Sequence, residues 1–384
     1  MLFVKELKKV ICSVTFVLFL AILLSFYATQ FSSEADSVLI EPVEGRDNYG
    51  MTETDDPAVI IPAAIERLTQ ETETNSYVAY PVGFYKEVML GDKKQNKMKE
   101  ILAALKEQYQ KGELSYDMFL DYMEQADKLI GGGSHYSDRF LISDFGYIPA
   151  SYEDARREYE AFISDDRITG AYARLFCDYL GIVLGIMPVF VAASLTERDR
   201  KAQMEQLIYS RKVTSAGLVI NRFLALIISM AVPVLLLSVM ATIQVHGLYE
   251  GMSIDKTAVI VMAVIWLMPN ILMATAVGMV LTEAYSPLLA VFVQSIWWIF
   301  SISTGKLTGA IHKFTFVLRH NNLMKRQAFV RQMNDFIFNR CFYVVAAVIL
   351  LAVTVWIYEK KRKGGFGGNT GFKKSFNRKF KVPV

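Results

Sequence analysis

The sequence from 257 to 282 reads TAVIVMAVIWLMPNILMATAVGMVLT and contains no Asp, Glu, Lys or Arg over 26 residues. An α-helix rises about 1.5 Å per residue, so this stretch would be about 39 Å long, more than the roughly 30 Å of hydrocarbon in a bilayer. Because lipid offers no partner to a free backbone N–H or C=O group, an apolar stretch that crosses a membrane in this way must be helical. The stretch therefore predicts a transmembrane helix.

Five further stretches have the same character, which makes six predicted spans. They consist mainly of Leu, Ile, Val, Phe, Ala and Met, and the whole chain is 53% hydrophobic. The six cover 10–27, 179–196, 223–249, 257–282, 284–305 and 341–358. The alternative, a set of helices in the core of a large soluble protein, is disfavoured by this apolar content. The predicted fold class is an all-α polytopic membrane protein with six transmembrane helices.

Basic residues gather beside particular ends of the spans. They are Lys5, Lys8 and Lys9 before the first span, Arg198, Arg200, Lys201, Arg211 and Lys212 between the second and third, and nine Lys or Arg residues after 358. Because basic flanks remain in the cytoplasm, both termini are predicted to be cytoplasmic. The connection 306–340 conflicts with this pattern: it would lie outside, yet it has seven basic residues against one acidic residue. A re-entrant or interfacial helix around 311–318 would shelter part of it.

Residues 29–173 are predicted to form an extracellular domain between the first and second spans. This segment holds 28 Asp or Glu against 14 Lys or Arg, a net charge of −14, although the whole chain is +3. Apolar residues repeat at helical spacing in 98–109 and 119–129, and Ser151 with Asp154 resembles a capping box. Residues 77–90 are expected to be extended. The domain should be mostly helical, all-α or α+β with a small sheet.

The chain is thus predicted to consist of four regions. They are the N-terminus and first span (1–28), the extracellular domain (29–173), the other five spans (174–358) and a basic cytoplasmic tail (359–384). The third region includes a cytoplasmic helix at 197–210 and an extracellular loop at 306–340.

The sequence lacks the common motifs of catalysis and cofactor binding. No stretch matches the phosphate-binding pattern G-x-x-x-x-G-K-[ST], and the four histidines show no paired spacing for zinc. The three cysteines lie in or at the edge of predicted spans, so no disulfide framework is implied. We therefore expect no enzymatic activity, no bound metal or cofactor, and no nucleic-acid partner.

Two carboxylates lie within or between the predicted spans. Asp178 is at the start of the second span and follows Arg174 by four residues, the spacing of neighbours on one helix face, so an ion pair at the membrane edge is expected. Glu283 precedes Ser286 and Pro287, which are typical of an N-cap and a first-turn proline. Ion-coupled carriers need ionisable groups at mid-membrane, so these few candidates disfavour a secondary transporter.

The segment between the second and third spans is charged but also carries apolar residues. It reads TERDRKAQMEQLIYSRK from 196 to 212, and Met204, Leu207 and Ile208 favour one apolar face of a short helix over a solvated loop. This pattern resembles the coupling helix of the ABC type-2 permease family, although the glycine and proline common there are absent. The matching positions are Glu197, Arg198, Glu205, Leu207, Ile208 and Arg211. Arg319-His320-Asn321 and Asn339-Arg340 are also similar to that family.

The resemblance implies a transmembrane permease subunit of an ATP-driven bacterial exporter, located in the cytoplasmic membrane. It implies a separate ABC ATPase subunit that binds ATP and Mg²⁺, a second permease subunit, identical or homologous, and contact with membrane lipids. Two other functions stay open: a membrane-embedded sensor with an acidic extracellular ligand-binding domain, and the disfavoured secondary transporter. The substrate and the direction of transport are not specified by the sequence.

Overall fold

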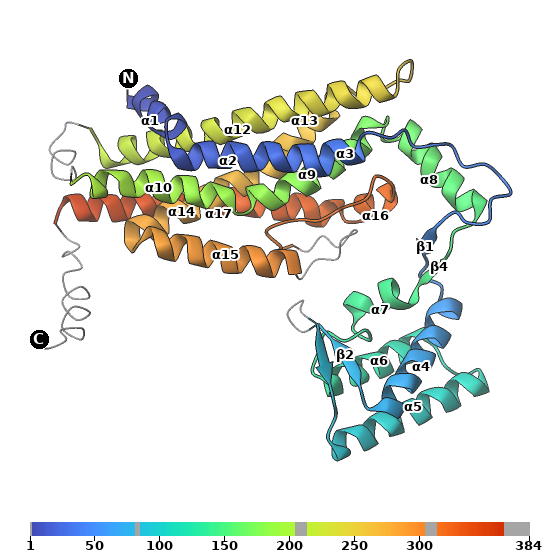
Figure 1. Cartoon of the computed structure of the whole chain (residues 1–384). Helices are drawn as coiled ribbons and strands as arrows, with labels where there is room; N and C mark the ends of the chain where they lie inside the picture. The colour runs from blue at the N-terminus through green and yellow to red at the C-terminus, as the bar shows by residue number, and fades with distance from the viewer. Residues whose placement is uncertain (1, 81–84, 204–212, 304–312, 365–384) are drawn as a thin grey trace, which may run out of the picture.

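The computed structural model describes residues 2–80, 85–203, 213–303 and 313–364, and it consists of a long helical bundle and a smaller head (Figure 1). The first described residues and the end of the last helix, Met333–Arg362, lie at one end of the bundle, on the left of Figure 1, and the head is attached at the other. We call these the tail end and the domain end of the bundle. The chain is mostly helical, as predicted.

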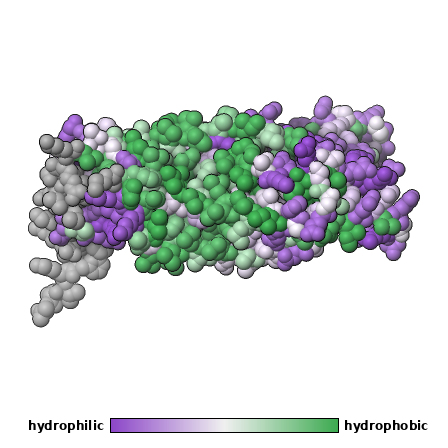
Figure 2. Space-filling model, turned by 90° about the horizontal axis from the view of Figure 1, so that it is seen from above, coloured by the Kyte–Doolittle hydropathy of each residue, from purple (hydrophilic) through white to green (hydrophobic). Residues whose placement is uncertain are grey.

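Five helical stretches of the bundle are long and apolar enough to cross a membrane. They are Val14–Glu34, Thr169–Lys201, Ser215–Leu248, Ala258–Ala284 and Met333–Arg362. They correspond to predicted spans one, two, three, four and six. The face seen in Figure 2 carries a broad apolar band around the middle of the bundle, with hydrophilic residues at both ends. The protein is therefore a multi-pass membrane protein.

The fifth predicted span, 284–305, corresponds to α15 (Pro287–Ser303), an apolar helix of 17 residues. At about 1.5 Å per residue its described part is about 26 Å long, slightly less than the hydrocarbon thickness. Residues 304–312 lie outside the described part of the chain. The helix begins as predicted, because the Ser286 hydroxyl accepts a hydrogen bond from Leu289 N at 3.2 Å ahead of the first-turn proline.

The N-terminus forms two helices rather than one. An amphipathic helix α1 (Leu2–Ile11) precedes α2 (Val14–Phe26), whose N-cap Ser13 accepts a hydrogen bond from Phe16 N. The first span then continues through a π-helical turn η1 (Tyr27–Phe31) into α3 (Ser32–Glu34). It therefore starts later and ends later than the predicted 10–27, because the apolar residues before Ser13 belong to α1.

The second span is broken. It comprises α9 (Thr169–Leu184) and α10 (Met187–Lys201), with Gly185 and Ile186 between them and Pro188 in the first turn of α10. Since proline lacks an N–H group and its ring clashes with the preceding turn, its position at the start of α10 agrees with an interruption here.

The fourth span is also irregular. It consists of α13 (Ala258–Met262), the π-helix η2 (Ala263–Leu267) and α14 (Met268–Ala284), and Pro269 lies in the first turn of α14. By contrast, the third span, α12 (Ser215–Leu248), continues as one helix past an internal proline. Interruptions of this kind leave backbone groups that need other partners.

The head is a compact helical unit with its own core. Its helices are α4 (Pro57–Thr74), α5 (Asp92–Lys111), α6 (Tyr116–Ile130) and α7 (Asp138–Phe145). The expected extended stretch 77–90 contains the paired strands β2 (Tyr77–Ala79) and β3 (Lys86–Val88), and its residues 81–84 lie outside the described part of the chain. The core side chains include Ile60, Leu68, Tyr77, Met98, Leu105, Phe119 and Tyr136. Glycine at 131 ends α6 in the left-handed region, at φ +119°, where other residues would be strained.

A two-stranded neck joins the head to the bundle. The strands β1 (Met51–Glu53) and β4 (Tyr147–Pro149) pair in antiparallel register, so the chain enters and leaves the head side by side. Helix α8 (Tyr152–Ser164) follows the neck and begins with the predicted capping box of Ser151 and Asp154. The short helix α16 (Arg326–Arg331) lies at the domain end. The last span, α17 (Met333–Arg362), starts there as well.

Candidate functional site

The predicted coupling segment begins inside α10 rather than as a separate helix. Glu197 and Arg198 lie in its last two turns, where Glu197 forms an ion pair of 2.7 Å with Lys201 and Arg198 donates to the Lys9 carbonyl at 3.2 Å. The other four predicted coupling residues, Glu205, Leu207, Ile208 and Arg211, lie outside the described residues. The first five residues of the predicted 197–210 helix are thus a direct extension of the second span.

A cluster of four charges, two of them buried and two partly exposed, lies beside this extension; we call it the tail-end ion cluster. The guanidinium of Arg222 on α12 contacts Glu6 at 3.2 Å and also Asp199, and Lys9 contacts Glu6 at 2.7 Å and Asp199 at 3.6 Å. The side chains of Arg222 and Glu6 are only 5% and 2% exposed. Buried charges are costly to leave unpaired, so each requires its partners. The cluster fixes the end of α10 to α1 and α12.

Further contacts join α10, α14 and α17 at the same end. Arg200 donates to the Thr282 carbonyl at 3.3 Å, and Lys361 forms an ion pair of 3.1 Å with Glu283. Glu283, which the sequence placed in the turn between spans four and five, is thus buried in the last turn of α14 and paired with the end of the last span. Five helix ends are therefore connected by charged side chains near the start of the predicted coupling segment.

The predicted ion pair between Arg174 and Asp178 is not found; each residue has a different partner. Asp178 accepts two hydrogen bonds from Arg319, at 2.9 and 3.1 Å, and a third from the backbone N–H of His320 at 2.5 Å. Arg174 forms a bidentate pair with Asp166, with both bonds at 2.7 Å. Two-pronged guanidinium–carboxylate pairing is stronger than a single contact between helix neighbours, so the tertiary partners prevail. Both residues are buried rather than at an exposed membrane edge.

Residues 313–325 form an irregular segment at the domain end, buried from 316 to 320, which we call the re-entrant segment. Phe316, Val317 and Leu318 are fully buried although the backbone is neither helix nor strand. Non-helical backbone at membrane depth is tolerated only where protein or a polar cavity satisfies it. Here Asn339 donates to the carbonyls of residues 313 and 315 at 3.1 and 2.8 Å. A re-entrant element was expected in 306–340, but its described part is not a helix.

The re-entrant segment reaches the break in the second span. A Cβ atom added to Gly185 would lie only 2.6 Å from the Cγ2 atom of Val317, so the two pieces of chain are in close contact. Gln294 on α15 donates to the carbonyl freed at Gly185, at 2.6 Å, and Trp298 donates to the Ile182 carbonyl at 2.8 Å. The interruption is thus stabilised by side chains from a different helix.

A second buried centre joins the fourth and sixth spans. Arg340 on α17 donates to the Trp266 carbonyl at 2.9 Å, in the π-helical turn, to Asn270 Oδ1 at 2.8 Å and to the Phe316 carbonyl at 3.2 Å. Its side chain also contacts Asn339. One guanidinium therefore satisfies an irregular helix and the re-entrant segment together.

Sequence reasoning missed Arg222 and Arg340 as buried functional groups. Both lie at the edge of a charge-free run, which is why they read as span-flanking residues rather than interior ones. In the sequence, Asn339-Arg340 stands out only through its similarity to a known family. The signal that could have revealed both arginines is a basic residue next to a polar residue within an otherwise apolar helix.

The described residues contain several buried ion pairs that join one part of the bundle to another. Among them, no group of three or more His, Cys, Asp or Glu side chains could hold a metal ion. The buried charges connect helices at the tail end through ion pairs, and at the domain end they brace irregular backbone through ion pairs and hydrogen bonds. Comparison of the chain with protein-family models, with curated proteins and with solved structures found no match.

Proposed function

We propose that this chain is the transmembrane permease subunit of an ATP-driven exporter, with six spans, a cytoplasmic tail end and an extracellular head. A separate ABC ATPase would bind ATP and Mg²⁺, a second permease subunit would complete the pathway, and the complex would lie in a bacterial cytoplasmic membrane. The observation that carries the proposal is the tail-end ion cluster, which attaches the start of the coupling segment to two other helices.

The cluster supports the proposal because it makes α10 a lever that cannot move alone. A force on the segment after Lys201 would act on α10, and through Arg222 and Glu6 it would also act on α12 and α1. At its other end α10 meets the break at Gly185, where the helix is already interrupted and the second span can bend without breaking further helical hydrogen bonds. A push at one end would therefore change the packing around the re-entrant segment.

The coupling segment is tested by two substitutions in the complete complex. Leu207→Asp places a charge on the apolar face that should dock against the ATPase, so we expect the ATPase to dissociate or to lose substrate-stimulated hydrolysis. Glu205→Ala should weaken transport without affecting membrane insertion. Ala202→Asp, an exposed residue just before this face, is the matched control and should retain coupling.

The measurements are co-purification of an ATPase with the chain and ATP hydrolysis in the presence of exported substrate. Normal hydrolysis and co-purification in both Leu207→Asp and Glu205→Ala would contradict the coupling role. Absence of any ATPase from complexes of the unaltered chain would overturn the permease assignment itself.

A further inference from the structure

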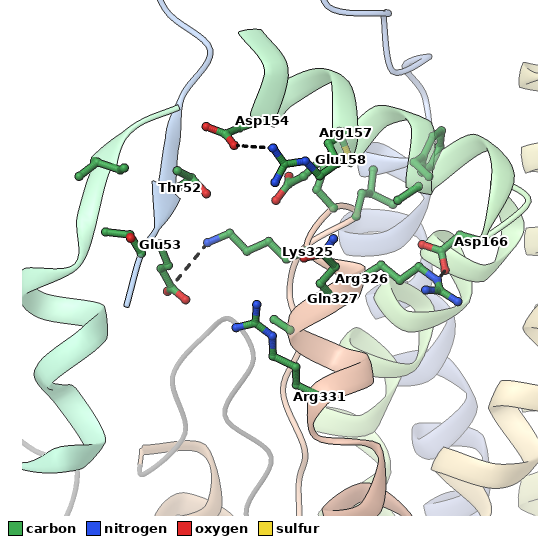
Figure 3. A pocket seen from close by; sticks show the side chains of 17 residues that line it. Thr52, Glu53, Asp154, Arg157, Glu158, Asp166, Lys325, Arg326, Gln327 and Arg331 are labelled. Atoms are coloured by element: carbon green, nitrogen blue, oxygen red, sulfur yellow. Dashed lines mark ion pairs between the residues drawn. The ribbon is translucent and has the colours of Figure 1, made fainter. Parts of the chain in front are cut away.

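A cavity of about 280 Å³ lies where the neck, α8 and α16 meet (Figure 3). One wall consists of β1, β4 and α8, and the other consists of α16 and the residues that precede it. The volume is close to the lower limit of about 300 Å³ for small-molecule sites. The cavity thus suits a ligand of a few heavy atoms up to the size of a dipeptide.

The two walls carry opposite charge. Lys325, Arg326 and Arg331 come from the α16 side, and in Figure 3 the side chains of Lys325 and Arg331 point into the space in front of Glu53. The opposite side supplies Glu53 and Glu158. A ligand that carries only one sign of charge would compensate one wall and leave the other unchanged.

Most of these charges already have partners. Arg326 contacts Asp165 and Asp166, each at 3.2 Å, and Arg157 contacts Asp154 at 3.4 Å. These pairs leave little attraction for an additional ion. They define the rim of the cavity rather than its free binding groups.

Two groups of opposite sign remain available. Within the described residues, neither the guanidinium of Arg331 nor the carboxylate of Glu158 has an ion-pair partner within 4 Å. Lys325 is only loosely engaged, at 3.9 Å from Glu53. Burial raises the pKa of Glu158, and the nearby Lys325 partly offsets this effect because a neighbouring cation favours the charged carboxylate.

We propose that this neck cavity binds a small zwitterion, an amino acid or dipeptide with a free carboxylate and a free ammonium group. The carboxylate pairs with Arg331, whose planar guanidinium can bind it through two hydrogen bonds, and Lys325 assists. The ammonium group pairs with Glu158. A bound zwitterion connects the wall formed by the neck and α8 to α16, and so to the last span. This inference goes beyond the proposed export function, because binding requires neither the ATPase nor transport.

The test uses the full chain in detergent and measures binding of dialanine by isothermal titration calorimetry. Two blocked probes separate the charges: N-acetyl-dialanine lacks the ammonium group, and dialanine amide lacks the carboxylate. We expect dialanine to bind saturably and each blocked probe to bind at least about tenfold more weakly, since each loses one charge-assisted contact.

Variants assign the two contacts. Arg331→Gln should weaken dialanine by about tenfold or more and abolish its preference over dialanine amide, and Glu158→Gln should abolish its preference over N-acetyl-dialanine. Arg156→Gln and Glu160→Gln are matched controls, because these residues form an exposed ion pair elsewhere on α8. No saturable binding of dialanine, or equal affinities in the two cavity variants and the two controls, would overturn the proposal. ATPase coupling is not measured, so this test can fail while the export function stands.

Discussion

Replacement of Arg222 by methionine tests the tail-end ion cluster most directly. The change keeps an unbranched side chain of similar length but leaves the Glu6 and Asp199 carboxylates without their shared partner. Removal of one member of a buried pair costs about 3–5 kcal/mol. Glu6 retains Lys9 at 2.7 Å, so we expect a loss near the lower limit, about 3 kcal/mol in the free energy of unfolding.

Reversible unfolding of the full chain in mixed detergent and dodecyl sulfate micelles, followed by tryptophan fluorescence, measures this loss. All four tryptophans lie in the bundle, so the signal reports the part that the cluster stabilises. Adding Glu6→Gln to Arg222→Met removes one of the two carboxylates that lost Arg222 and should recover at least about 1 kcal/mol, which identifies the electrostatic origin of the loss. Lys8→Met, an exposed cation on α1, is the control and should cause no resolvable change.

Two results would refute this reasoning. A loss below about 1 kcal/mol for Arg222→Met would show that the cluster is worth no more than a surface ion pair. No recovery in the Arg222→Met and Glu6→Gln double variant would show that lost packing, rather than an unpaired carboxylate, causes the effect.

The same unfolding assay tests two other features. Gly185→Ala should destabilise the chain by about 1–3 kcal/mol because its Cβ atom would lie 2.6 Å from Val317. Gly247→Ala is the control and should be neutral or slightly stabilising, because its Cβ atom would have nothing within 4 Å. Equal effects of the two substitutions would exclude close packing at the break. Asp178→Asn should cost about 3–5 kcal/mol because Arg319 would remain buried beside a neutral group, and a loss under 1 kcal/mol would contradict the importance of that pair.

Local chemistry made parts of the fold predictable. A capping box requires only two residues three positions apart, so Ser151 and Asp154 predicted the start of α8. The Ser286 N-cap ahead of a proline likewise located α15. The spans followed from charge-free runs, because the cost of burying charge in lipid is large and independent of tertiary detail. Features of this kind depend on neighbours in sequence.

Tertiary contacts could not be predicted in the same way. Asp178 pairs with Arg319, which is 141 positions away, and nothing in the local pattern favours that partner over Arg174. The break at Gly185 depends on a donor from Gln294 on another helix. A glycine and a nearby proline only permit such an interruption. Which carbonyls are freed, and which side chains satisfy them, is decided when distant segments pack.

The neck has a consequence for how such a protein can evolve. Thr54 donates to the Gly146 carbonyl at 2.8 Å, so the two points where the chain crosses between bundle and head are adjacent. A unit whose ends are this close resembles a domain inserted into a loop, which can be exchanged without altering the host. Recombination could therefore replace the whole head with one of another size or specificity while every spanning helix kept its position. The spanning helices and the head would then diverge at independent rates.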